Sequence, residues 1–151
     1  MIVSNTSPLI VLKKARAIML LTELFKEILI PSAVWSELKV REEEFFKRLE
    51  GLRITEVGDR RLVNALALTV DLGEAEAIAL SLETDVPLLI DDLKGRRIAR
   101  RMGVRIIGSL GVLALAKRNG LVDCVKPYID RFLAEGYKRL VEEFLKALDE
   151  A

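Results

Sequence analysis

The segment GEAEAIALSLETDVPLLIDD, residues 73–92, joins an acidic helix to a short apolar strand that ends at two aspartates. We predict the helix over residues 74–83 and the strand over residues 87–90. Four further apolar runs alternate with helical patterns along the chain, which indicates βαβ units and a parallel sheet. In such a sheet the strand ends gather at one edge, where ligands bind. Acidic residues far apart in the sequence are therefore expected to meet there.

The same alternation extends outward over the rest of the chain. We expect the other strands at residues 2–4, 27–30, 53–57 and 104–107. Helices are expected at residues 8–15, 17–25, 32–50, 60–69, 93–102 and 109–119. Ser7 is expected to cap the first of these and Pro8 to open it. The tail, residues 128–148, carries an apolar stripe from Ile129 to Leu148 and is expected to form one amphipathic helix.

Composition limits the class of protein. The chain has 151 residues, is 51% hydrophobic and carries a net charge of +1. This length predicts a single domain, residues 1–151, and any basic patch must be local. No apolar run is long enough for a membrane span, and the amino terminus does not resemble a signal peptide. We therefore expect a cytoplasmic protein that does not contact membranes.

Missing residue types narrow the chemistry. The sequence contains no histidine, which excludes Ser-His-Asp catalysis and histidine-ligated zinc. Its single cysteine, Cys124, cannot form an internal disulfide and is expected in the core. Carboxylates, lysine, hydroxyl groups and a hard metal ion remain for catalysis.

The predicted sheet edge gathers several candidate ligands. Asn5 ends the first strand, where it is either a turn residue or an oxygen ligand. Glu37 lies on the border of an apolar helix face, and the alternative is a solvated glutamate. Glu74 opens its helix three residues after Asp71, a spacing that also fits a capping box. Glu76 follows on the same helix.

Asp91 and Asp92 are two adjacent acids at the end of a buried strand. One of them is expected to cap the next helix, but a cap needs only one carboxylate. At least one of the two is therefore expected to face the pocket. Clustered carboxylates repel one another, and a divalent cation commonly holds such a group together.

The helix after these aspartates is strongly basic. Its cations suit a polyanion whose reacting phosphate is held by the metal. The alternative is a solvated face, and few aromatic residues accompany the patch to stack on bases. The candidates for binding RNA phosphates are Lys94, Arg96, Arg97 and Arg100.

Taken together, these motifs resemble those of the PIN-domain family, in particular its VapC-like metal-dependent ribonucleases. SNTSPLI resembles the first motif of that family, PSAVWSEL the second, and residues 73–92 the third and fourth. The resemblance covers most of the chain. It implies a three-layer α/β/α sandwich around a central, mostly parallel five-stranded sheet.

The resemblance also implies a function. It suggests Mg²⁺- or Mn²⁺-dependent hydrolysis of RNA, often by the toxin of a toxin–antitoxin pair. RNA, an antitoxin protein and a second copy of the chain are the partners expected. The four site positions correspond to Asn5, Glu37, Glu74 and Asp92, with Asp91 as a further metal ligand and Glu76 in support.

Two positions depart from the family pattern. Asn5 stands where the family has an aspartate, so its oxygen can bind a hard cation but adds no negative charge. Glu74 stands where aspartate is usual. A PIN-like protein that binds RNA or a partner without cleaving RNA is therefore the main alternative. A receiver-like phosphatase fits less well, because receiver domains place paired acids after the first strand.

Overall fold

The computed structural model describes the backbone of residues 1–150 and the side chains of residues 1–147. Within this range five strands form one sheet in the order β3-β2-β1-β4-β5, and every pairing is parallel. The strands are β1 (Ile2–Ser4), β2 (Ile28–Ile30), β3 (Leu52–Ile54), β4 (Leu88–Leu89) and β5 (Ile106–Ile107). All five lie within or overlap the predicted runs, which confirms the parallel α/β class.

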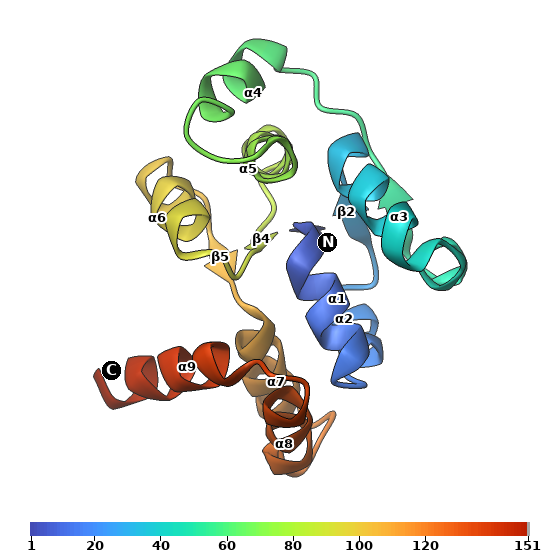
Figure 1. Cartoon of the computed structure of the whole chain (residues 1–151), viewed down its shortest axis with the longest axis vertical. Coiled ribbons are helices and arrows are strands. Elements are labelled where there is room, and N and C mark those ends of the chain that lie inside the picture. Colours follow the sequence, from blue (N-terminus) through green and yellow to red (C-terminus); the bar gives the residue numbers. More distant parts are fainter. Residues whose placement is uncertain (151) are drawn as a thin grey trace.

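Helices cover both faces of the sheet (Figure 1). Side chains alternate along each strand, so Ile2 and Leu89 pack on one face while Val3 and Leu88 pack on the other. The first face carries α1 (Thr6–Lys14), α2 (Ile18–Phe25), α3 (Ser32–Arg48), α7 (Ser109–Arg118), α8 (Lys126–Ala134) and α9 (Lys138–Glu150). The second carries α4 (Arg60–Leu66), α5 (Leu72–Thr84) and α6 (Leu93–Arg101). This is the expected three-layer sandwich.

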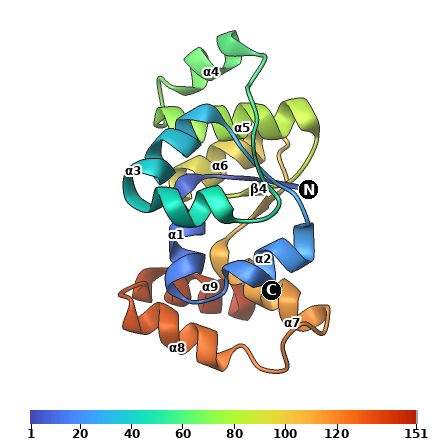
Figure 2. The same cartoon turned by 90° about the vertical axis from the view of Figure 1, so that its right-hand side faces the viewer.

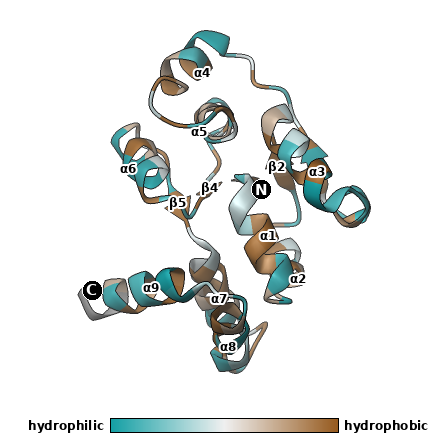
Figure 3. Cartoon of the chain, viewed as in Figure 1, coloured by the Kyte–Doolittle hydropathy of each residue, from teal (hydrophilic) through white to brown (hydrophobic). Residues whose placement is uncertain are grey.

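The last three helices gather at one end of the molecule and α4 lies at the other end (Figures 1 and 2). Apolar residues dominate α1, whereas polar and apolar residues alternate along α9 (Figure 3). Within the described residues, no helix combines the length and the apolar character that crossing a bilayer requires.

The tail is not the single helix that we predicted. It divides into α8 and α9 at Gly136, whose φ of 89° ends the first helix in the left-handed region that glycine readily adopts. The apolar stripe continues across the break, which is why its periodicity concealed the glycine. The side chain of Leu148, which we placed on this stripe, and the whole of Ala151 lie outside the described residues.

Two local predictions were also wrong. The N-cap position of the first helix is Asn5 rather than Ser7, and its side chain makes no capping bond, so Pro8 is the third residue of the helix. Cys124 is exposed in the loop between α7 and α8 instead of lying in the core. The apolar neighbours of Cys124 in sequence do not enclose it.

Candidate metal centre

Glu74 lies at the start of α5, where the predicted capping geometry is present. The Asp71 side chain is the N-cap and accepts a hydrogen bond of 2.8 Å from the backbone N–H of Glu74. The Glu74 side chain is half-buried, and its Oε2 atom is buried without a hydrogen-bond partner among the described residues. Because buried polar atoms are nearly always bonded, this oxygen is a candidate ligand for a cation.

Asp92 lies beside Glu74, at the start of α6. It is the N-cap of that helix, and its Oδ2 atom accepts a hydrogen bond of 2.8 Å from the backbone N–H of Gly95. A Cβ atom at Gly95 would lie 2.9 Å from Oε2 of Glu74 and 3.4 Å from Oδ2 of Asp92. The glycine therefore leaves the space in which these two carboxylates approach each other.

This crowding changes the acidity of Glu74. Burial, together with hydrogen bonding and repulsion from the neighbouring carboxyl groups of Asp71 and Asp92, raises the pKa of Glu74 from 4.5 to about 8. The ionised form of Glu74 is therefore disfavoured when no cation is bound. A divalent cation would favour that form and relieve the repulsion.

Glu37 approaches the same group of acids from α3. Its side chain is exposed, and a Cβ atom at Gly73 would lie only 2.6 Å from Oε1 of Glu37 and 3.5 Å from Oδ1 of Asp71. A second glycine thus makes room for a carboxylate at this site. We call Glu37, Asp71, Glu74 and Asp92 the acidic site.

Asn5 sits beside the end of β4, since its backbone N–H donates a 3.0 Å hydrogen bond to the Leu89 carbonyl. The residue is 7% exposed, and its side chain makes no capping bond to α1. The neighbouring Thr6 hydroxyl is buried and has no hydrogen-bond partner among the described residues. The amide of Asn5 is therefore not committed to the helix that it precedes.

The oxygen donors of the acidic site are those that a hard divalent cation prefers. The unbonded Glu74 oxygen and the repulsion around it also fit a cation. Among the side chains that the structure describes, however, no three carboxylates or thiols already surround a single point. Completing a coordination shell therefore needs side-chain rotation, for which the exposed Glu37 and Asp92 are placed.

Asp91 points away from the acidic site. β4 ends at Leu89, and the two residues beyond Ile90 lie on opposite sides: Asp91 contacts Ser109 of α7, whereas Asp92 lies near Glu74 of α5. The Asp91 carboxylate accepts hydrogen bonds from Ser109, from the backbone N–H at 2.8 Å and from the hydroxyl. Burial raises the pKa of Asp91, and the bonds from Ser109 oppose that rise. The structure thus does not bring Asp91 together with Glu74 and Asp92.

Glu76 holds two elements of the site together. It is 5% exposed, and its Oε1 atom accepts a 2.9 Å hydrogen bond from the backbone N–H of Ala33. Its Oε2 atom accepts a 2.7 Å bond from Arg60. Glu76 therefore fixes the start of α3, which carries Glu37, against α5, which carries Glu74.

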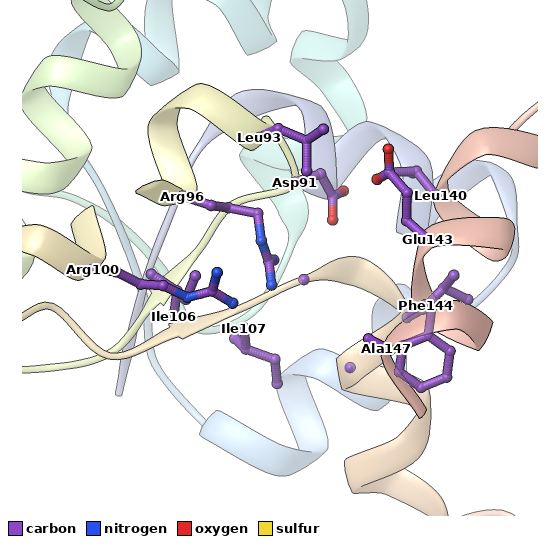
Figure 4. Close-up of a pocket in the computed structure, with 13 residues that line it drawn as sticks. Asp91, Leu93, Arg96, Arg100, Ile106, Ile107, Leu140, Glu143, Phe144 and Ala147 are labelled. Atoms are coloured by element: carbon purple, nitrogen blue, oxygen red, sulfur yellow. The ribbon is translucent and has the colours of Figure 1, made fainter. Parts of the chain in front are cut away.

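The four predicted phosphate-binding residues divide over the surface of α6. Lys94, Arg97 and Arg100 are exposed, whereas Arg96 is half-buried and donates a 2.8 Å hydrogen bond to the Ile90 carbonyl. Arg96 and Arg100 line a cavity of about 430 Å³ next to Asp91, between α6, β5, α7 and α9 (Figure 4). Glu143 and Phe144 of α9 line it from the opposite side.

Sequence reasoning missed part of these surroundings. Asp71 was noticed only as a helix cap, although it also crowds Glu74. The glycines next to acidic residues, Gly73 and Gly95, were a usable signal for closely spaced carboxylates. No local sequence pattern indicated Glu143, because its position opposite α6 depends on how α9 packs.

The geometry agrees with a comparison of the sequence with known families. The sequence model of the family described as PIN domain matches residues 1–150. No curated protein gives a significant match to the chain. The match spans the whole parallel sheet and both carboxylate-bearing helices, α3 and α5. The chain therefore belongs to the PIN-domain family.

Proposed function

We propose that this protein is a metal-dependent endoribonuclease that hydrolyses phosphodiester bonds of RNA. PIN domains have a nuclease-type fold and generally use divalent metal ions. The observation that carries the proposal is the Glu74 carboxylate. It has an unbonded buried oxygen and is crowded by Asp71 and Asp92, as expected of a site that is complete only with a cation.

Glu37, Glu74 and Asp92 would hold the ion through carboxylate oxygens, with the Asn5 carbonyl oxygen as a neutral ligand. When bound, Mg²⁺ or Mn²⁺ supplies an activated water and neutralises charge that develops on the phosphate. The helix dipoles of α5 and α6 point their positive ends toward this place, because both helices begin there. Lys94 and Arg97 bind the neighbouring phosphates from the exposed side of α6.

We also propose a cellular role for the protein. The resemblance to VapC-like ribonucleases supports a toxin of a toxin–antitoxin pair that acts in the cytoplasm and is bound by an antitoxin protein. Exposed apolar side chains on several helices, among them Met19, Val40 and Leu145, supply contact area for such a partner or for a second copy of the chain.

The test is cleavage of a mixed single-stranded RNA pool in Mn²⁺ and in EDTA. We expect cleavage only in Mn²⁺, and a loss of at least about a hundredfold in Asp92→Asn and in Glu74→Gln. Asparagine retains the capping function, so Asp92→Asn removes charge without removing the cap of α6. Glu43→Gln, at an exposed carboxylate elsewhere on α3, is the matched control and should cleave normally.

A binding protein that does not cleave RNA is the second candidate, and the neutral Asn5 favours it. It predicts that the wild type binds Mn²⁺ and RNA but cleaves no member of the pool. Cleavage that persists in EDTA or in both variants would contradict the metal mechanism and indicate a contaminating nuclease.

A further inference from the structure

The cavity next to Asp91 is lined by two arginines, two carboxylates and several apolar side chains. Its volume of about 430 Å³ lies in the range of small-molecule sites. Arg96 and Arg100 reach into it from α6, and Phe144 lies opposite on α9 (Figure 4). Ile107 and Leu110 supply apolar surface between them. None of these groups takes part in the acidic site.

The two guanidinium groups are available to a ligand. Among the side chains that the structure describes, no carboxylate lies within 4.0 Å of either group. Burial and then repulsion from Arg100 lower the pKa of Arg96, while attraction to Asp91 and Glu143 opposes that change. Arg96 uses a donor on the Ile90 carbonyl and keeps others, because a guanidinium has five N–H donors. A phosphate between the two side chains would relieve their repulsion.

The other polar groups of the cavity limit where a phosphate can bind. The start of α7 would attract an anion, but Asp91 already accepts hydrogen bonds from the N–H and the hydroxyl of Ser109. The α6 arginines therefore remain as the anion site. On α9, one oxygen of Glu143 accepts a 2.9 Å bond from Arg139, and the carboxylate keeps capacity to accept from a further N–H group.

The cavity and the acidic site are separated by a single step of the chain. Asp91 faces the cavity and Asp92 faces the acidic site, and consecutive Cα atoms are about 3.8 Å apart. Gly95 of α6 contacts Glu74, while the next residue, Arg96, reaches the cavity. A phosphate at the acidic site and a nucleotide in the cavity would thus lie on either side of the segment that follows β4.

We propose that this cavity binds the ribonucleotide next to the scissile phosphate, with Arg96 and Arg100 on its phosphate group and its base against Phe144. Glu143 accepts N–H groups of the base, which favours guanine because its Watson–Crick edge presents two adjacent donors. The inference rests on the proposed function, since it places the nucleotide relative to the phosphate held at the acidic site. A peptide in this cavity would need no such proximity.

The test separates the cavity from the acidic site by omitting the metal. In EDTA, titration of the full chain with the four ribonucleoside 5′-monophosphates should give saturable binding, tightest for GMP. Arg100→Met should weaken binding at least tenfold. Arg118→Met, at an exposed arginine near the far end of α7, should bind like the wild type.

Further variants guard against trivial loss of folding. Ala147→Trp fills the cavity from the exposed side of α9 and should abolish binding without a fall in Tm. Glu143→Gln should remove the preference for GMP while leaving the affinity for UMP unchanged. Binding of no nucleotide at millimolar concentration, or equal binding by Ala147→Trp, would overturn the proposal.

The two proposals can fail separately. Metal-dependent RNA cleavage with no effect of Ala147→Trp on KM or on the base next to the cut would remove the nucleotide subsite and leave the nuclease. Nucleotide binding in EDTA with no cleavage in Mn²⁺ would contradict the nuclease and support only the nucleotide-binding role of the cavity. Competition by a protein partner, with no nucleotide binding, would assign the cavity to that partner and contradict the subsite.

Discussion

Asp91 and Asp92 are neighbours in sequence but belong to two differently constructed regions. On the cavity side, the Asp91 carboxylate is bonded to the N–H and the hydroxyl of Ser109. At the acidic site, Asp92 approaches Glu74, whose buried Oε2 atom has no hydrogen-bond partner among the described residues. The Asp91 carboxylate is therefore hydrogen-bonded without a ligand, whereas Oε2 of Glu74, within the part of the chain that the structure describes, is not. The position of an acid in the sequence thus says less about its role than the groups that surround it.

Metal affinity should separate the two aspartates most strongly. We expect Asp92→Asn to weaken Mn²⁺ binding at least about a hundredfold, or about 2.7 kcal/mol, because it removes a charged ligand. Asp91→Asn should bind Mn²⁺ like the wild type, since Asp91 faces α7. Isothermal titration calorimetry measures both affinities. Equal losses of Mn²⁺ affinity in the two variants would indicate that Asp91 is also a metal ligand.

Folding stability should show the opposite order. In EDTA, Asp91→Ala should lower the free energy of unfolding by about 2–3 kcal/mol, because it removes hydrogen bonds between Ser109 and a charged group. Asp92→Ala loses an N-cap worth about 1 kcal/mol and also relieves repulsion on Glu74. Urea unfolding of both variants makes the comparison. A larger loss for Asp92→Ala would mean that the cap matters more than the Ser109 contacts.

The pH dependence of stability should sharpen the comparison with a smaller effect. The folded-state pKa of Glu74 is about 8, above its ordinary value of 4.5, so the folded chain holds a proton that the unfolded chain releases. This contribution to stability is complete below pH 4.5 and is lost as the pH rises through 8. Glu74→Gln lacks this loss.

In EDTA, the Tm of Glu74→Gln should therefore rise relative to the wild type between pH 4.5 and 8. A pKa rise from 4.5 to about 8 corresponds to at most about 5 kcal/mol. Solvent screening reduces this value for the half-buried Glu74, so we expect a final difference of at least about 2–4 °C, the shift that 1 kcal/mol gives in a chain of this length. Thermal unfolding followed by circular dichroism measures it, with Glu43→Gln as the control. Parallel pH profiles for Glu74→Gln and the wild type would show that Glu74 ionises normally.

Much of the sheet could be predicted from the sequence, because short apolar runs between amphipathic helices are typical of buried parallel strands. The cap at Asp92 was also anticipated in kind, since one of two acids before a helix is expected to cap it. The roles of Asn5, Glu37, Glu74 and Asp92 as ligands stay predictions. The structure supplies the approach of Asp92 to Glu74, the approach of Glu37 to Asp71, and the unbonded oxygen of Glu74.

Other features depend on contacts that no local pattern encodes. Alternation along β4 implies that Asp91 and Asp92 face opposite sides, but only the packing of α5 and α7 decides which side holds the acids. The division of the tail at Gly136 was signalled by the glycine and hidden by the continuing apolar stripe. The meeting of Glu143 with the α6 arginines depends on that division, because it turns α9 back along the cavity.

Glu76 has a mechanical consequence for the whole acidic site. It joins the start of α3 to α5 and so couples these two helices. Glu37 and Glu74 therefore keep their spacing when either helix moves. Asp92 does not belong to this coupled pair of helices, because it lies on the segment between β4 and α6. Side-chain rotation around an ion would therefore start from a fixed pair of helices and a separate Asp92. Glu76, which has no proposed contact with metal or RNA, thus sets the spacing of Glu37 and Glu74.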